Sequence, residues 1–192
     1  QAFVVAPVFA QKMATVNVVQ IFGTVDPAKV NDYTEYMAAV NMYEALTTLD
    51  SSGSIKPLLA ESWDVSADTL TYTFELKSGA TFQDGSPVEA KDVVYSVNRL
   101  LALNEGPSYL FEGVLDENSV SAVGNDKVEF KLKKVYTPFL TNTPILFVVN
   151  SDVAEANKTS SDPWAQDFIA NNTIGAGAFK MTNWERGATM TM

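Results

Sequence analysis

The stretch FQDGSPVEAKDVVYS, residues 82–96, brings Asp84, Glu89 and Asp92 close together in the sequence. Carboxylates grouped in this way could bind a metal ion or serve as a general acid and a general base. The spacing does not fit a calcium-binding loop, which needs oxygen ligands at alternate positions before its glycine. The stretch is therefore either a reactive cluster or a piece of scaffold.

Local structure accounts for each polar residue of this stretch. Asp84 and the glycine after it form a favoured turn pair, because glycine accepts positive φ and the aspartate bonds the following backbone. Ser86, Pro87 and Glu89 match the N-cap, the first helical position and the reciprocal capping position of a helix. Asp92 falls in the first turn, where a negative charge is favourable. We therefore interpret the stretch as a turn followed by a capped helix.

The composition excludes several classes of function. The 192 residues are 46% hydrophobic, which is enough for a sizeable core, and their formal net charge of −10 argues against nucleic-acid binding. These residues include no Cys and no His, so they offer no thiol nucleophile, disulfide, thiolate–zinc site or histidine base. The glycines of GAGA, residues 175–178, lack the pattern of a phosphate-binding loop. We expect no catalytic residue, no metal site and no cofactor.

The first residues are typical of a secretion signal. An apolar run extends from Ala2 to Ala10, and Val8-Phe9-Ala10 has the small-x-small arrangement of a signal-peptidase site. We expect residues 1–10 to be the remnant of a signal peptide that is cleaved after Ala10. An ordinary first strand is the alternative interpretation of the same run.

Hydrophobic periodicity predicts both strands and helices. Alternating apolar residues predict strands at 70–77 and 127–133, and residues 119–123 are expected to form a hairpin with the second of them. A buried strand is predicted at 15–23, and a strand is also expected at 145–149. Residues 55–66 look irregular, with Trp63 as an anchor. A short helix is predicted around Phe139.

The segment that follows the first strand is predicted to be a helix. Asn31 or Asp32 would cap this helix, and five apolar residues would form its inner face. These residues are Tyr36, Met37, Val40, Tyr43 and Leu46. At the other end of the chain, alternating residues predict two strands, around 179–184 and 188–192, and the second of them stops without a turn. We therefore expect the sequence to be a fragment of a longer protein.

A series of short motifs runs in order from residue 42 to residue 101. They are Tyr43-Glu44 with Leu46, Pro57-Leu58, Ala60-Glu61-Ser62-Trp63, Tyr72 to Leu76, Phe82 with Asp84-Gly85, and Ala90-Lys91-Asp92-Val93 with Arg99. This series resembles the bacterial extracellular solute-binding proteins of family 5, the peptide/nickel type that serves ABC importers. VDPAKV at 25–30 and IGAGAFKMTNWERG at 174–187 extend the resemblance, although Ala176 and Ala178 replace a Thr and a Pro of the family pattern.

The resemblance implies a mixed α/β fold of the type II periplasmic-binding-protein class. It implies that residues 11–44 belong to the core of the first lobe, that 45–170 form an inserted mixed α/β subdomain, and that 171–192 return to the core. The second lobe is expected to lie after the end of this sequence. Such a fragment should bind solute weakly by itself, because closure around a ligand needs two lobes.

The resemblance also implies a function without catalysis. The protein would be periplasmic and monomeric, and it would capture a peptide or another small solute and deliver it to an ABC permease in the inner membrane. The implied ligand-binding residues are the loop Thr24, Val25 and Asp26, with Tyr43 and Tyr109 as aromatic walls. Dipeptides, oligopeptides, nickel chelates, sugars and opines all remain open as the solute.

Two other classes of protein stay open at this point. One is a secreted hydrolase that depends on carboxylates such as Asp84 and Glu89. The other is an interaction domain that has no substrate. Tyr43 and Tyr109 could equally be core or surface aromatics.

Overall fold

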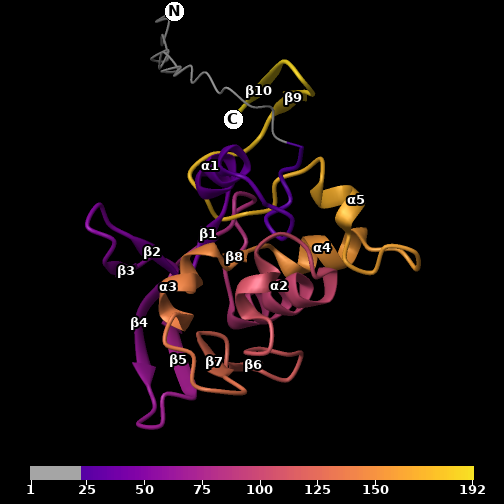
Figure 1. Ribbon diagram of the computed structural model, residues 1–192. Helices are drawn as coiled ribbons and strands as arrows, with labels where there is room; N and C mark the ends of the chain where they lie inside the picture. The colour runs from indigo at the N-terminus through magenta and orange to yellow at the C-terminus, as the bar shows by residue number, and fades with distance from the viewer. Residues whose placement is uncertain (1–22) are drawn as a thin grey trace, which may run out of the picture.

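The computed structural model describes residues 23–192, which form a mixed α/β fold (Figure 1). The predicted signal peptide and most of the strand predicted at 15–23 lie outside the described residues. The helices are α1 (Tyr33–Met42), α2 (Ala90–Leu103), α3 (Phe139–Asn142), α4 (Ser151–Asn157) and α5 (Gln166–Ile169), with 3-10 turns η1 (Gly106–Phe111) and η2 (Thr143–Ile145). The strands are β1 (Glu44–Ala45), β2 (Thr47–Leu49), β3 (Ile55–Pro57), β4 (Ala60–Val65), β5 (Thr71–Leu76), β6 (Val120–Val123), β7 (Lys127–Lys131), β8 (Phe147–Val148), β9 (Asn183–Glu185) and β10 (Thr189–Thr191).

The largest sheet is antiparallel, with the order β4-β5-β7-β6. The predicted strand at 70–77 is confirmed, because Tyr72, Phe74 and Leu76 of β5 are buried while the residues between them are half-exposed. The predicted hairpin is confirmed as well, since β6 pairs with β7. Phe74 contacts Phe130 of β7 edge to face, with ring centroids 5.6 Å apart. Helix α2 packs against β6 and β7.

The prediction that residues 55–66 are irregular is wrong, because they form β3 and β4. Among the described residues, β3 pairs only with β2, across the turn at 50–54, and β4 is an edge strand bonded only to β5. Edge strands bury little apolar surface and therefore lack clear alternation; Pro57 is tolerated at such an edge. Trp63 is the half-buried anchor that was predicted, with its ring 6.2 Å from that of Phe74.

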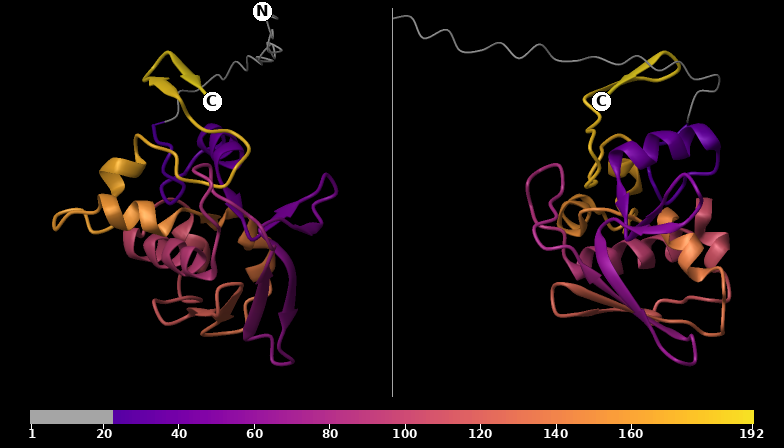
Figure 2. Two further views of the ribbon diagram at one scale, coloured as in Figure 1. Left: turned by 180° about the vertical axis from the view of Figure 1, so that it is seen from behind. Right: turned by 90° about the vertical axis from the view of Figure 1, so that its left-hand side faces the viewer.

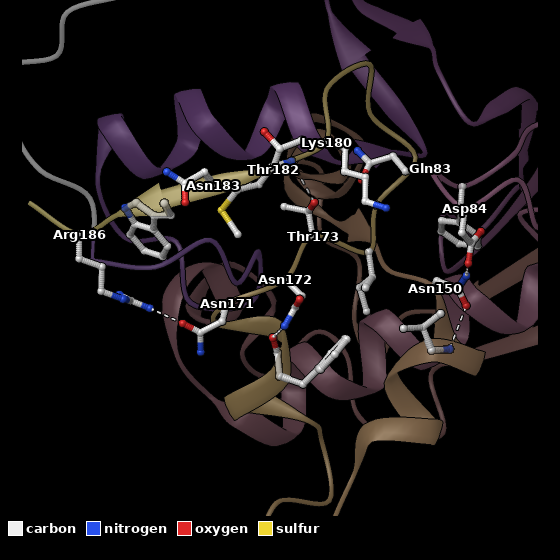
Figure 3. Close-up of a pocket in the computed structure, with 17 residues that line it drawn as sticks. Gln83, Asp84, Asn150, Asn171, Asn172, Thr173, Lys180, Thr182, Asn183 and Arg186 are labelled. Atoms are coloured by element: carbon white, nitrogen blue, oxygen red, sulfur yellow. Dashed lines mark hydrogen bonds between the residues drawn. The ribbon is translucent and has the colours of Figure 1, made fainter. Parts of the chain in front are cut away.

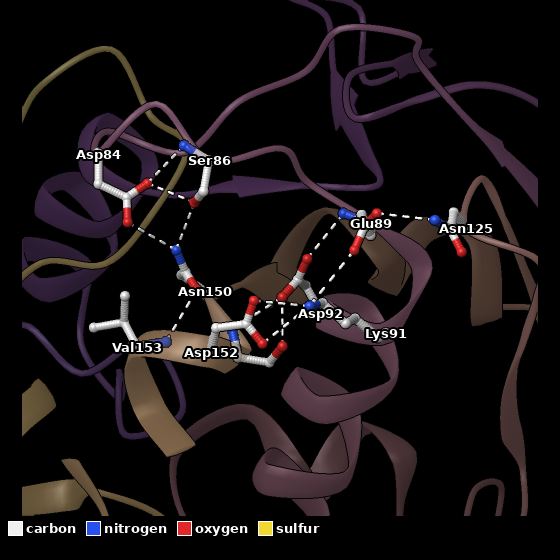
Figure 4. Close-up of polar contacts among 10 residues, drawn as sticks. Asp84, Ser86, Glu89, Lys91, Asp92, Asn125, Asn150, Asp152 and Val153 are labelled. Carbon is white, nitrogen blue, oxygen red and sulfur yellow. Dashed lines mark hydrogen bonds and ion pairs between the residues drawn. The ribbon is translucent and has the colours of Figure 1, made fainter. Parts of the chain in front are cut away.

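The helix after the acidic stretch begins at Ala90, so the predicted N-cap at Ser86 is wrong (Figure 4). The backbone at Pro87 is extended and bridges to Thr81, which delays the helix. The Ser86 hydroxyl donates to Asp84 Oδ1 at 2.6 Å instead of capping a helix. Glu89 becomes the N-cap residue, and a capping box does form, but one helical turn later than predicted.

Asp92 is the acceptor that fixes the start of α2. Its Oδ2 accepts the backbone N–H of Glu89 at 2.8 Å, and its Oδ1 accepts both the N–H and the hydroxyl of Ser151, at 3.0 and 2.6 Å. Asp92 is only 1% exposed and joins α2 to α4. The Glu89 side chain accepts from Asn125 Nδ2 at 3.0 Å. The acidic stretch therefore acts as scaffold, as its local pattern indicated.

Helix α1 differs from its prediction in the face that it buries. Asp32 caps the helix as expected, since its Oδ1 accepts the N–H of Glu35 at 2.9 Å. The buried residues are Thr34, Glu35, Ala38, Ala39 and Met42, of which only Met42 is large and apolar. Val40, predicted to lie inside, is exposed, and Tyr43 lies beyond the helix end in extended backbone. Small side chains let the helix approach its neighbours closely, so Ala38 and Ala39 pack in the core where Val40 was expected to do so.

Two hydrophobic clusters make up the core. The first contains the inner face of the four-stranded sheet with α2, η1 and α3, and the second contains residues near α1, α4 and α5. Strands β1 and β8 pair with each other, which brings together the two ends of the segment between them. The four-stranded sheet and the β9–β10 hairpin lie at opposite ends in all views (Figures 1 and 2). No helix within residues 23–192 is long and apolar enough to cross a membrane.

Candidate functional site

The loop 23–31 carries three of the predicted ligand-binding residues, and one carboxylate holds both of its ends. Glu35 Oε1 accepts the backbone N–H of Gly23 at 3.0 Å, and Oε2 accepts the N–H of Asn31 at 3.0 Å. Glu35 is 5% exposed and lies in the first turn of α1. Helix α1 therefore closes the base of the loop.

Side chains of the loop itself hold its interior. Thr24 Oγ1 accepts the N–H of Asp26 at 2.9 Å, and Asp26 Oδ1 accepts the N–H of Ala28 at 3.0 Å. Val25 is buried in the second hydrophobic cluster. Of the three predicted residues, only Thr24 is partly exposed. The loop can thus offer a ligand its backbone and Thr24 rather than the buried side chains of Val25 and Asp26.

Asp26 forms a buried ion pair with Arg99 of α2. The guanidinium is bidentate, with Nη1 2.7 Å from Oδ1 and Nη2 2.6 Å from Oδ2, and Arg99 Nε donates to the carbonyl of Trp164 at 2.9 Å. The two side chains are 0% and 1% exposed. Buried charges are tolerated when they are paired and fully hydrogen-bonded, as here. This pair fixes the loop to α2 and to the segment before α5.

The other two predicted residues differ in exposure, since Tyr43 is buried and Tyr109 is exposed. Tyr43 is 1% exposed and packs against Phe147, with ring centroids 6.3 Å apart. Tyr109 lies on η1 and is 70% exposed. The start of η1 touches the loop, because a Cβ added at Gly106 would lie 2.7 Å from the carbonyl oxygen of Ala28. The structure therefore places the segment of Tyr109 beside the loop and leaves Tyr43 in the core.

Burial makes Tyr43 sensitive to alkaline pH. Desolvation raises the pKa of the Tyr43 hydroxyl well above its usual value, and the negative charge of Asp26 raises it further. Since the folded-state pKa is above the unfolded value, stability is full below about pH 10 and falls as pH rises above it. We expect the free energy of unfolding to fall by about 1.4 kcal/mol per pH unit from this group.

Denaturant unfolding between neutral and alkaline pH measures this effect. Tyr43→Phe should make the alkaline slope shallower, whereas Tyr33→Phe, at a side chain that is 76% exposed, should leave it unchanged. Equal alkaline slopes for Tyr43→Phe and the unmodified chain would contradict the assignment.

A polar pocket of about 450 Å³ lies next to the loop (Figure 3). Its polar lining residues are Gln83, Asp84, Asn150, Asn171, Asn172, Thr173, Lys180, Thr182, Asn183 and Arg186. Apolar contributions come from Phe82, Val153, Phe168, Ile174, Met181 and Trp184. No prediction from sequence pointed to this pocket, because its lining comes from four separate segments whose amides have no characteristic spacing.

Arg186 connects the pocket to the loop. Its guanidinium donates to the carbonyl of Gly23 and the carbonyl of Ala170, each at 3.2 Å, and to Asn171 Oδ1 at 2.9 Å. The same group lies 3.9 Å from the centre of the Trp184 ring, a cation–π contact. The wall of the pocket and the start of the loop are thus one hydrogen-bonded unit. In residues 23–192 no group of three or more acidic side chains is placed to hold a metal ion.

Comparison with known proteins identifies the family. Residues 54–192 match the family described as bacterial extracellular solute-binding proteins, family 5 Middle. The chain belongs to this family. Its members are non-catalytic substrate-binding proteins of ABC transporters, so the expectation that the protein is not an enzyme is confirmed at the level of the family.

Individual relatives support the same assignment. The chain is 30% identical over 176 residues to the probable D,D-dipeptide-binding periplasmic protein DdpA of Escherichia coli K12, covering 88% of this chain and 33% of that protein. It matches NikZ from Campylobacter jejuni in complex with Ni(L-His) at a TM-score of 0.74 and 26% identity, covering 88% of this chain and 32% of that one. It matches Haemophilus influenzae OppA in complex with RPPGFSPFR at a TM-score of 0.75 and 26% identity, covering 88% of this chain and 36% of that one.

These matches confirm the mixed α/β part of the predicted fold class. The chain spans about a third of the length of each of these relatives.

Proposed function

We propose that the whole protein is the exported solute-binding component of an ABC importer. It captures a peptide or a similar small solute between two lobes and delivers it, as a monomer, to a permease in the inner membrane. The observation that carries this proposal is the family match over residues 54–192. Relatives that are themselves named as periplasmic support export, and the cleavage after Ala10 remains a prediction.

We propose that this chain supplies most of the first lobe. Residues up to 44 and residues 171–192 would form part of the lobe core, with 45–170 inserted between them. The pairing of β1 with β8 supports an insertion, because it joins the start of the proposed insertion to residues 147–148. The core has two hydrophobic clusters, and buried residues between 147 and 169 pack in the second one with residues 25–45, so this last part of the proposed insertion contacts the lobe core.

The ligand would lie against the loop 23–31. Backbone groups at the end of a strand suit a peptide-like ligand that is held by main-chain hydrogen bonds. Thr24 supplies the half-exposed side chain of this loop, and Asp26 acts through the loop conformation that its hydrogen bonds fix. Tyr109 is exposed on η1, whose first residue lies against the loop, and it would form an aromatic wall when the second lobe closes.

A thermal-shift screen of the full-length protein tests the proposal. The panel is D-alanyl-D-alanine, glutathione, RPPGFSPFR and Ni(L-His), whose chemistry spans that named for the relatives. A solute present at 100 times its Kd stabilises the folded state by about 2.7 kcal/mol, which appears as a higher Tm. We expect at least one panel member to raise Tm. A flat response to the whole panel would contradict the proposed function.

Replacing the carboxylates of Asp84 and Glu89 with amides distinguishes the binding-protein hypothesis from the hydrolase hypothesis. Asp84 accepts from the backbone N–H and the hydroxyl of Ser86, so Asp84→Asn should lower the free energy of unfolding by about 1 kcal/mol. Glu89→Gln should have a smaller effect, because its partner Asn125 is exposed. Neither variant should remove a turnover activity. Loss of a hydrolytic activity at unchanged stability would favour the enzyme.

A further inference from the structure

We propose that Glu35 is a positioning residue that keeps the loop 23–31 in its ligand-binding conformation. This inference rests on the proposed function and adds to it a residue that would set affinity without contacting the solute. The geometry that points to it is the use of both carboxylate oxygens of Glu35 on the two ends of one loop, at 3.0 Å each.

The carboxylate of Glu35 is itself held rigidly. The residue is 5% exposed and sits in the first turn of α1, where the helix dipole favours a negative charge. Its own backbone N–H is bound by Asp32 Oδ1 at 2.9 Å, which fixes the turn that carries it. The two amide hydrogen bonds compensate a charge that would otherwise be costly to bury.

The remaining anchors of the loop act at other points. Arg99 holds the middle of the loop through the Asp26 carboxylate, and Arg186 holds the carbonyl of Gly23. Glu35 alone among these three side chains binds both ends, and it does so through backbone N–H groups. Loss of one of its hydrogen bonds should therefore loosen the loop ends and leave the buried ion pair in place.

A looser loop lowers affinity in a predictable way. If only a fraction of molecules has the competent loop, the apparent Kd rises by the inverse of that fraction. Glu35→Gln keeps the size of the side chain but replaces one acceptor oxygen with an NH2 group, so it can satisfy only one of the two amides. We expect the Kd of a solute to rise about tenfold, which corresponds to a competent fraction of about one in ten.

The experiment uses the full-length protein and whichever panel solute gives the largest Tm shift, measured by calorimetry. Hydrogen exchange on the solute-free protein is the second readout, because it reports loop opening directly. Glu35→Gln should raise the Kd and accelerate exchange at residues 24–31, with exchange in β5 and β7 unchanged. Glu61→Gln, the same substitution at an exposed site on β4, should change neither quantity.

The outcomes separate this inference from the proposed function. If the unmodified protein binds a panel solute and Glu35→Gln binds it equally well, the positioning role is wrong and the proposed function stands. If no panel solute binds the unmodified protein, the proposed function fails, and unchanged exchange at 24–31 would overturn the positioning role independently. If Glu35→Gln does not fold, Glu35→Asp keeps the charge but shortens the side chain. Should Glu35→Asp also fail to fold, Glu35 is a folding residue and the inference is overturned.

Discussion

Arg99→Met is expected to lower the free energy of unfolding by about 3–5 kcal/mol, because it leaves the Asp26 carboxylate buried and unpaired. The wild-type pair is bidentate at 2.6 and 2.7 Å, and both side chains are 1% exposed or less. The same substitution removes the hydrogen bond from Arg99 to the carbonyl of Trp164. The effect should therefore include loosening of the loop and of the segment before α5.

Urea denaturation of Arg99→Met, Asp26→Asn and the double variant measures the coupling between the two residues. The double variant should be destabilised by less than the sum of the single variants, because no charge is left unpaired in it. Lys127→Met is the control, since its ion pair with Glu75 is exposed at 43% on each side and should contribute less than about 1 kcal/mol. Additive effects of the two single variants would contradict a coupled pair.

Gly177→Ala is expected to destabilise the protein by about 3 kcal/mol or more, because there is no room for a methyl group. A Cβ at this position would lie 2.4 Å from the carbonyl carbon of Met42 and 2.6 Å from the backbone nitrogen of Tyr43. These neighbours are backbone atoms and cannot move as a side chain would. Gly177 also donates to the carbonyl of Met42 at 3.1 Å, and the added methyl group would force these segments apart.

Ala178→Ser provides the matched control for this prediction. Ala178 is the next residue of the same segment and is exposed, so its substitution should change stability by no more than about 0.5 kcal/mol. Thermal and urea unfolding of both variants gives the comparison. A Gly177→Ala variant as stable as Ala178→Ser would mean that the close approach of residue 177 to the end of α1 is incorrect.

The glycines of the 175–178 segment have a packing role that the sequence does not predict. They lack the pattern of a phosphate-binding loop, and in the structure they pack against the end of α1. Gly175 and Gly177 both lie against the backbone of Met42. A larger side chain would not fit at either position, but Met42 lies more than 130 positions away in the chain, so this requirement could not be inferred from the local pattern.

Elements with strong local signals were the ones predicted correctly. The alternation in β5 and β7 and the Asp32 cap of α1 all depend on nearby residues. Strand β4 was not predicted, because exposed edge strands lack clear alternation of apolar and polar residues. The predicted start of α2 is too early, because the extended backbone at Pro87 pairs with Thr81. In both cases a partner strand or bridge decided the structure.

For the candidate site, the motif that carries Asp26 predicts the loop but not its contacts. The partner of Asp26 could not be inferred, because Arg99 lies 73 residues away. Glu35 was not singled out, since a carboxylate in the first turn of a helix is common and its bonds to Gly23 and Asn31 depend on how the loop folds back. The pocket lined by Arg186 was not predicted either, because its lining comes from segments that only the fold brings together.

Isothermal titration calorimetry of the full-length protein, with mass analysis of the solute afterwards, tests the central claim most directly. The titrants are D-alanyl-D-alanine, glutathione, RPPGFSPFR and Ni(L-His). A solute-binding component of an ABC importer should bind at least one of them in a one-to-one complex and release it chemically unchanged. Cleavage of a bound peptide, or no heat of binding with any of the four, would contradict the proposed function.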